Sequence, residues 1–380
     1  MLPFITGFFW LLVASAMFYM VVVFLFTFGW LRIKHFYQRT NAPLSEISIV
    51  VAVRNESRHV EQLLKAIALQ DYPRDKYEIV VVNDHSEDDT VKLINSFREE
   101  NDTIDISLLE TEAEGKKAAI YTGIDKAKYQ LVATTDGDCT MGPNWLQRLA
   151  TYYTLKKPKM IIGPVVYAEK KGLLRHFFML DFMSLVASGA GSLGLSLPLM
   201  ANGANLMFSK ETYRNVISRQ AGKSSASGDD VFLLHAVAKK WGAKQIHFIK
   251  APHALVETNP PENMKQFMQQ RIRWASKATA YRSWWAVFVS LVVFMFNLLL
   301  LFSLFSVILK VWFIVIYLLF SLLKMVVDFP LLRHFSEFAG RKKSLYYLFL
   351  FGWIYPVYIV FTAVYSFVFR YNWKGRENLK

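Results

Sequence analysis

The first 31 residues carry no charged side chain and are strongly apolar. A segment of this length is sufficient to cross a lipid bilayer as a helix. It lacks the positive start and the small-residue cleavage site of a signal peptide. Arg32, Lys34 and Arg39 follow at once, so the positive-inside tendency places the far end of the helix in the cytoplasm. Residues 1–33 are therefore predicted to form an N-terminal transmembrane anchor.

The carboxyl-terminal part of the chain is apolar as well. Residues 284–309 are predicted to form one membrane span, and Lys310 the tip of a helical hairpin. Residues 311–332 are predicted to form a second span, although the charges of Lys324 and Asp328 make it less apolar. We predict a membrane region of two to three spans over residues 284–380.

The last apolar segment, residues 345–369, leaves two topologies open. It could cross the membrane a third time despite Pro356. If the basic loop 333–343 is cytoplasmic, that crossing puts the basic tail 370–380 outside, against the positive-inside tendency. A re-entrant or interfacial segment would resolve the conflict.

Composition and charge agree with a membrane protein. The chain is 53% hydrophobic and 19% charged, with 44 Lys and Arg against 30 Asp and Glu. A net charge of +14 admits nucleic acid, an anionic membrane surface or phosphorylated substrates. Zinc-finger spacing and aromatic-glycine RNA motifs are missing from the sequence, so we expect no nucleic-acid partner. Cys139 is the single cysteine, which excludes an intramolecular disulfide and fits a cytosolic domain.

Between the apolar ends, short apolar runs alternate with helical patterns. Such an order indicates an α/β domain with a doubly wound, mostly parallel sheet, within a cytosolic domain at 34–283. The strands are expected at 47–53, 77–82, 106–109, 131–135, 160–167 and 203–208, and the helices at 54–67, 90–97, 114–127, 172–188 and 263–275.

The stretch 131–146 combines a strand with two closely spaced acids. Asp136-Gly137-Asp138 follows the strand directly, and ligands of open α/β sheets bind at the carboxyl ends of their strands. Two carboxylates one residue apart can approach one hard cation and leave room for phosphate oxygens. The alternative is an ordinary Asp-Gly turn.

Residues 189–194 match G-x-G-x-x-G, the dinucleotide-binding fingerprint. The match follows an apolar helix at 172–188 instead of a strand, so we expect no dinucleotide site there. Within this helix, Arg175 and Asp181 could meet an acceptor, but a helix facing solvent or membrane is favoured.

Seven short motifs occur in an order that resembles the membrane-bound family-2 glycosyltransferases of the GT-A fold, the group of the cellulose, chitin and hyaluronan synthases. The resemblance covers about residues 47–277. The motifs are VAVRNE (51–56), VVNDHSEDDT (81–90), EGKKAA (114–119), TTDGDC (134–139), GANLMF (203–208), SGDDVFL (227–233) and QRIRW (270–274).

This resemblance implies how a nucleotide-sugar donor is bound. Asp138 would bind Mg²⁺ or Mn²⁺, with Asp136 on the ribose or sharing the metal. Asp84 would hold the nucleoside, together with the backbone at Ala52 and Val53 and the carboxylate of Glu56. Lys116 would contact the nucleotide.

The resemblance also implies the acceptor side of the reaction. Asp230, with Asp229 beside it, would take the proton of the acceptor hydroxyl as general base. The QRIRW motif supplies Gln270, Arg273 for the diphosphate and Trp274 for a sugar acceptor or for closing the site.

Each of these residues also has a structural interpretation. Asp229 and Asp230 could cap a helix, and Asp84 could form a turn. Arg273 and Trp274 could anchor the chain at the membrane interface.

We expect a metal-dependent inverting glycosyltransferase, a multi-pass protein of the plasma or inner membrane with a cytoplasmic catalytic domain. It would transfer one or a few sugars from a UDP-sugar to a lipid, lipid-linked or glycan acceptor in cell-envelope synthesis. The alternatives are a processive polysaccharide synthase, a nucleotidyltransferase and a non-catalytic membrane scaffold.

Overall fold

The structure is a computed structural model that describes residues 2–38, 44–217, 229–276, 283–368, 372–373 and 376–377. The chain divides into two compact units. The α/β unit consists of Ile33–Ala168 and Met200–Asn259, and the helical unit of Met1–Arg32, Glu169–Leu199 and Pro260–Lys380. Each unit is described by itself.

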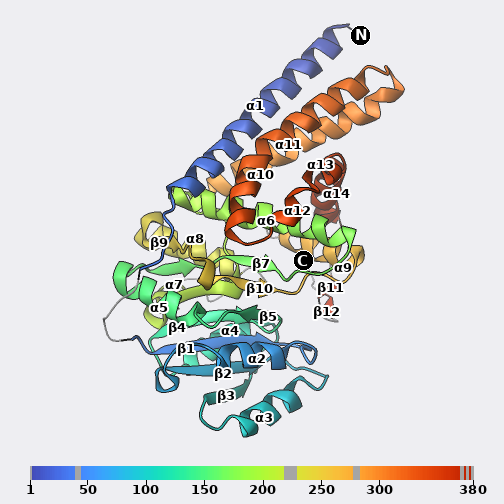
Figure 1. The fold of residues 1–380 in the computed structure, drawn as a ribbon. Coiled ribbons are helices and arrows are strands. Elements are labelled where there is room, and N and C mark those ends of the chain that lie inside the picture. Colours follow the sequence, from blue (N-terminus) through green and yellow to red (C-terminus); the bar gives the residue numbers. More distant parts are fainter. Residues whose placement is uncertain are drawn as a thin grey trace. The chain divides into compact units, whose positions relative to one another are not determined.

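The α/β unit contains a seven-stranded sheet in the order β3-β2-β1-β4-β8-β6-β9 (Figure 1). The first four of these strands are parallel, β8 runs antiparallel to both β4 and β6, and β6 is parallel to β9. The predicted GT-A-type α/β fold with a mostly parallel sheet is confirmed. The strands are β1 Ile47–Val53, β2 Tyr77–Asn83, β3 Asp105–Glu110, β4 Leu131–Asp136, β6 Met160–Ile162, β8 Leu206–Ser209 and β9 Ile246–Phe248.

The helices of this unit alternate with the strands, but the prediction that a helix opens at residue 54 is wrong, because residues 54–59 form bends and turns and α2 begins at Val60. In α2, the apolar positions Val60, Leu63, Leu64 and Ile67 are all buried. This spacing puts one apolar stripe on the core. The helices are α2 Val60–Ala68, α3 Thr90–Glu100, α4 Lys116–Lys126, α5 Trp145–Lys156, α7 Lys210–Ile217 and α8 Asp229–Trp241.

The prediction of one strand over 160–167 is wrong. The segment forms two strands in different sheets, because Gly163-Pro164 interrupts it. β7 Val165–Tyr167 joins β10 Val256–Thr258 and β5 Cys139–Met141 in a three-stranded sheet. The predicted strand at 203–208 starts late, since Gly203–Asn205 is a 3-10 turn before β8.

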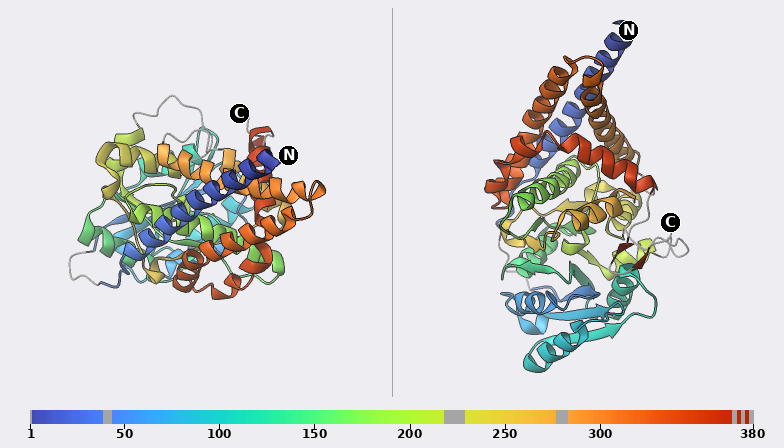
Figure 2. Two further views of the ribbon diagram at one scale, coloured as in Figure 1. Left: turned by 90° about the horizontal axis from the view of Figure 1, so that it is seen from above. Right: turned by 90° about the vertical axis from the view of Figure 1, so that its right-hand side faces the viewer.

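Among its described residues, the helical unit contains four helices that are long and apolar enough to cross a membrane: Ile5–Arg32, Leu173–Gly194, Trp284–Ile308 and Phe313–Phe338. Helices α1, α10 and α11 lie side by side (Figures 1 and 2) and share a core of large apolar side chains. The elements of this unit are α1 Leu2–Arg32, α6 Leu173–Gly194, α9 Met264–Ser276, α10 Trp284–Phe305, α11 Phe313–Phe338, α12 Lys342–Leu345, α13 Leu348–Phe351, α14 Tyr355–Val368, β11 Asn372–Trp373 and β12 Arg376–Glu377.

The G-x-G-x-x-G match lies inside α6, where it serves helix packing. A Cβ on Gly191 would come within 2.1 Å of the backbone oxygen of Phe26 in α1. A Cβ on Gly29 would lie 1.9 Å from the oxygen of Gly191. The two backbones therefore touch, as small residues allow in membrane-type helix pairs.

Two expectations for the carboxyl-terminal part change. The predicted loop 333–343 is helical up to Phe338, because α11 continues past Pro330. The last apolar segment is not one straight helix: Lys342–Phe351 and Tyr355–Ser366 meet at a bend of 85°. This bend fits either a broken span or a re-entrant segment, and Phe369 with most of the tail lies outside the described residues.

Candidate active site

The Asp136-Gly137-Asp138 turn joins β4 to β5, at the carboxyl end of the parallel strands. Asp136 is the β-ladder neighbour of Ala52 on β1. A Cβ on Gly137 would lie 2.9 Å from Cγ of Glu56 and 3.1 Å from Cγ1 of Val53. The glycine thus lets the turn pack directly on the segment after β1, and the predicted residues Ala52, Val53 and Glu56 lie beside the two acids.

Asp138 is held by the strand next to it. Oδ2 of Asp138 accepts a hydrogen bond of 3.0 Å from the Thr258 hydroxyl, and its carbonyl accepts one of 3.2 Å from the Asn259 amide. Burial raises the pKa of the Cys139 thiol well above its usual value, and the charges of Asp138 and Asp136 raise it further. Cys139 is therefore a neutral packing residue.

Lys116, at the first position of α4, donates a hydrogen bond to Oδ1 of Asp136. Its ammonium also lies 3.9 Å from the position that a Cβ would take on Gly203. Gly203 is hydrogen-bonded on both sides: its carbonyl accepts from Thr134 on β4 at 2.8 Å, and its N–H donates to Oδ2 of Asp230 at 3.1 Å. The predicted base and the predicted nucleotide lysine thus both lie beside Gly203, and the lysine in turn pairs with the first acid of the turn.

Asp230 has contacts beyond those of a helix cap. Oδ1 accepts from the N–H of Val231 at 2.9 Å, while Oδ2 reaches Gly203 on another element. Asp229 begins α8, and its side chain, like Ser227 and Gly228, lies outside the described part of the chain.

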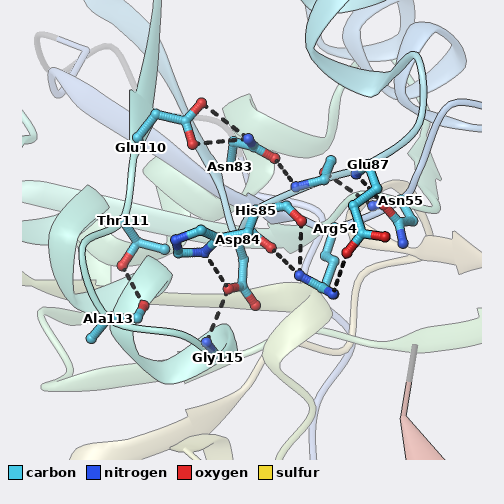
Figure 3. A network of polar contacts seen from close by, with 11 residues as sticks. Arg54, Asn55, Asn83, Asp84, His85, Glu87, Glu110, Thr111, Ala113 and Gly115 are labelled. Atoms are coloured by element: carbon cyan, nitrogen blue, oxygen red, sulfur yellow. Dashed lines mark hydrogen bonds and ion pairs between the residues drawn. The ribbon is translucent and has the colours of Figure 1, made fainter. Parts of the chain in front are cut away.

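Asp84 connects the loops that follow the first three strands (Figure 3). Its buried carboxylate accepts a hydrogen bond of 3.0 Å from the N–H of Gly115, and Nδ1 of His85 lies 3.4 Å from the same oxygen. The backbone N–H of Asp84 donates to the carbonyl of Val53 at 2.8 Å. Asp84 is therefore more than a local turn former.

Arg54, which the sequence interpretation missed, organises the same loops. One nitrogen of its buried guanidinium donates to the carbonyls of Asp84 and His85, both at 2.8 Å, and the other lies 3.4 Å from Glu87. A charged residue directly after a buried strand, within VAVRNE, was the available signal.

Gln270, Arg273 and Trp274 lie on α9 of the helical unit and are all half-buried. Their neighbour Arg271 is buried and forms an ion pair with Asp181 of α6. Nη1 of Arg271 donates to Oε1 of Gln270 at 2.9 Å, and its guanidinium lies 4.3 Å from the centre of the Trp274 ring. The expectation that Asp181 faces solvent or membrane is wrong, because its side chain is buried and paired with Arg271. The sequence did not reveal this pair, because the two residues are 90 positions apart.

The chemistry of the turn fits a divalent cation bound together with a substrate. Mg²⁺ is usually held by one or two carboxylates plus phosphate oxygens, and Asp136 and Asp138 offer such a pair. Within the described residues, no group of three or more His, Cys, Asp and Glu could form a cage made by the protein alone.

A mostly parallel sheet with acids and a lysine at its carboxyl edge is typical of nucleotide-binding α/β proteins, and sequence comparison specifies the family. The profile of glycosyl transferase family 2 matches residues 48–198, and that of glycosyl transferase family group 2 matches residues 131–371. The second match spans more than half of the chain. The protein belongs to the family-2 glycosyltransferases.

Curated relatives share parts of the chain. It is 36% identical over 107 residues to glycosyltransferase AglE of Haloferax volcanii, covering 28% of this chain and 35% of that protein. It is 27% identical over 244 residues to the probable glycosyltransferase YdaM of Bacillus subtilis, covering 61% and 55%. It is 25% identical over 267 residues to a poly-beta-1,6-N-acetyl-D-glucosamine synthase of Staphylococcus epidermidis, covering 66% and 60%. The chain thus spans about a third to three fifths of their lengths.

Among solved structures, the mannosyltransferase PcManGT of Pyrobaculum calidifontis, in complex with GDP-Man and Mn²⁺, has a TM-score of 0.58. The sequences are 16% identical, and the match covers 94% of this chain and 98% of that one. At this identity the likeness shows the fold.

Proposed function

We propose that this protein is a membrane-anchored, metal-dependent inverting glycosyltransferase that uses a nucleotide-sugar, most simply a UDP-sugar. The observation that carries the proposal is the grouping of Asp230 and Lys116 beside Gly203, with the ammonium of Lys116 paired to Asp136. Transfer from a sugar diphosphate requires a base, a cation and a metal-binding acid near one another, and these three residues would supply them at one edge of the sheet.

The donor would lie across the carboxyl ends of β1 and β4. The Asp84 loop and the segment of Ala52, Val53 and Glu56 would hold the nucleoside, and the ammonium of Lys116 would contact the diphosphate. Asp136 and Asp138 would hold Mg²⁺ or Mn²⁺, which supplies positive charge that stabilises the leaving diphosphate. PcManGT, which shares the fold, was solved with GDP-Man and Mn²⁺.

Transfer needs one displacement. Asp230 takes the proton of the acceptor hydroxyl while that oxygen bonds to the anomeric carbon. The bond from this carbon to the diphosphate breaks, and its electron pair leaves with the nucleoside diphosphate. The configuration at the anomeric carbon is inverted, and no covalent enzyme intermediate is needed.

On α9, Arg273 would bind the diphosphate with a planar fork, and Gln270 with Trp274 would contact the acceptor. The four apolar helices would hold the catalytic domain, expected at 34–283, at the cytoplasmic face of the membrane. An acceptor carried by a lipid could then reach the site from the interface.

A processive polysaccharide synthase is the second candidate. It is favoured by the similarity to a poly-beta-1,6-N-acetyl-D-glucosamine synthase over 267 residues. Two to three carboxyl-terminal spans are few for a polysaccharide channel, so we favour transfer of one or a few sugars. A nucleotidyltransferase would release pyrophosphate, and a scaffold would bind nucleotide without turnover.

The test is release of nucleoside diphosphate by the purified chain in detergent. A panel of UDP-sugars and GDP-mannose is offered with Mn²⁺ or Mg²⁺ and a polyprenyl phosphate acceptor. Asp230→Asn should abolish release, and Asp229→Asn, tested in parallel, shows which acid of the pair is the base. Release by Asp230→Asn at the wild-type rate would overturn the assigned base, and a long polymer would favour the synthase.

A further inference from the structure

Asp181 and Tyr355 lie on two helices that flank the QRIRW helix. Asp181, on α6, forms an ion pair with Nε of Arg271 through Oδ2. The hydroxyl of Tyr355, on α14, donates a hydrogen bond of 3.0 Å to Oδ1 of the same carboxylate. Each oxygen of Asp181 therefore holds a different helix of the helical unit.

Arg271 is enclosed as well as paired. It is 3% exposed, and its guanidinium lies 4.3 Å from the ring centre of Trp274 and 4.7 Å from that of Phe267. Phe267 is in turn stacked on Phe178 of α6 at 4.3 Å. An arginine stays charged at any physiological pH, so burial at this position requires the Asp181 carboxylate.

Besides Phe267, Arg271 contacts two neighbours on its own helix, and these two are residues with proposed roles. Nη1 donates to Oε1 of Gln270, and the plane of the guanidinium supports the indole of Trp274. Tyr355 is itself restrained, because the ammonium of Lys324 lies 4.6 Å from its ring centre and pairs with Asp328 at 2.5 Å.

We infer that Asp181 and Tyr355 are positioning residues that act through Arg271 on Gln270 and Trp274, and so set the acceptor end of the site. Arg271 occupies a variable position of the Q-x-x-R-W pattern, so this role is additional to that of Arg273. The inference rests on the proposed function, in which Gln270 and Trp274 contact the acceptor.

The first test reads the Trp274 ring without any substrate. The full chain is labelled with 5-fluorotryptophan, and the Trp274 resonance in the fluorine NMR spectrum is assigned by its loss in Trp274→Phe. Asp181→Asn, Tyr355→Phe and Arg271→Lys should each move this resonance by more than its linewidth. Lysine keeps the charge but loses the plane that supports the ring.

Ser192→Ala is the matched control. Ser192 is buried on the same helix as Asp181 and accepts a 2.7 Å hydrogen bond from Trp285. This change should move the Trp285 resonance, assigned with Trp285→Phe, and leave that of Trp274 in place. A Trp274 resonance that stays fixed in both Asp181→Asn and Tyr355→Phe would overturn the inference.

The second test is kinetic, with the donor and acceptor that show release in the panel. If Gln270 and Trp274 are displaced, Asp181→Asn should lower kcat/KM for the acceptor about 100-fold. The Kd of the nucleoside diphosphate should stay unchanged. Asp181→Asn should cost little further activity in a background of Gln270→Ala and Trp274→Ala, where both residues it acts on are already removed, and additive losses would contradict the inference. If the wild-type protein released no nucleoside diphosphate in the panel, this result would count against the proposed function alone, because the NMR test needs no turnover.

Discussion

The ammonium of Lys116 donates a 2.5 Å hydrogen bond to Oδ1 of Asp136, although both side chains are about a third exposed. Without substrate, the lysine thus neutralises an acid of the proposed metal site. A bound diphosphate would compete with Asp136 for this ammonium. In the proposed site, this ion pair would therefore couple the binding of the nucleotide to the binding of the metal ion.

Replacing Lys116 by methionine tests this link. A hydrogen bond between charged groups contributes about 1.5–3 kcal/mol, so the Kd of UDP with Mn²⁺ should rise at least about tenfold. The affinity for Mn²⁺ alone should stay or increase, because Asp136 loses a competing cation. Isothermal titration measures both, with Lys117→Met as control, and unchanged UDP affinity would refute the contact.

Asn205 connects three segments beneath the site. Its amide nitrogen donates to the carbonyls of Pro164 and Ala254 at 2.9 and 2.8 Å, and its oxygen accepts from Nε1 of Trp145 at 3.0 Å. Asn205→Leu has a similar volume but removes the partner of the Trp145 indole N–H and of the Ala254 carbonyl, at about 1–3 kcal/mol each, while the Pro164 carbonyl keeps the N–H of Val256 at 3.0 Å.

We therefore expect a large fall in the melting temperature of Asn205→Leu. Asn202→Ala, which loses one hydrogen bond to the N–H of Ala204, should cost about 1 kcal/mol or less. Equal melting temperatures of the two variants would contradict the role given to Asn205.

Local sequence patterns were sufficient for the parallel core of the sheet. The strands β1 and β2 are nearly continuous apolar runs, and such runs form strands that are buried on both faces, whereas β4 was recognised by the β-favouring residues Leu131, Val132, Thr134 and Thr135. The turn at Asp136 and Asp138 was predictable because the β-favouring run ends there in Asp-Gly-Asp, a turn-forming sequence.

Contacts between distant residues were not predictable from these patterns. The Arg271 and Asp181 pair joins two helices, and each residue alone reads as an exposed charge in an amphipathic segment. The break at Gly163-Pro164 was missed because the apolar run continues on both sides of it. The first part pairs with β8 and the second with β10, and only tertiary structure separates them.

Lys250 predicts a dependence of stability on pH. Burial lowers the pKa of this lysine to about 8, and the pKa of His35 is lowered by burial and then by the charge of Lys250. Between pH 8 and the ordinary lysine value, the unfolded chain binds more protons than the folded one, so the folded state gains stability as pH rises. Below pH 8 the destabilising effect of the buried charge is fully present.

Lys250→Met should therefore raise the melting temperature at pH 7, and the gain should shrink between pH 8 and 10. Thermal melts across this range measure it, with the exposed Lys239→Met as control. A gain that is equal at pH 7 and pH 10 would show that charge is not the cause.

Gly29 and Gly7 lie on the same helix and offer a matched pair of substitutions. A Cβ on Gly29 would meet the backbone oxygen of Gly191 at 1.9 Å, whereas a Cβ on Gly7 would meet no atom within 4 Å. Backbone cannot move aside as a flexible side chain can, so Gly29→Ala must separate α1 from α6. The cost should reach about 1–3 kcal/mol, as for other overpacked sites.

Gly7→Ala should leave the melting temperature of the detergent-solubilised protein unchanged or slightly higher, because alanine favours the helix. If Gly29→Ala melts at the same temperature as Gly7→Ala, α1 and α6 do not pack through these glycines.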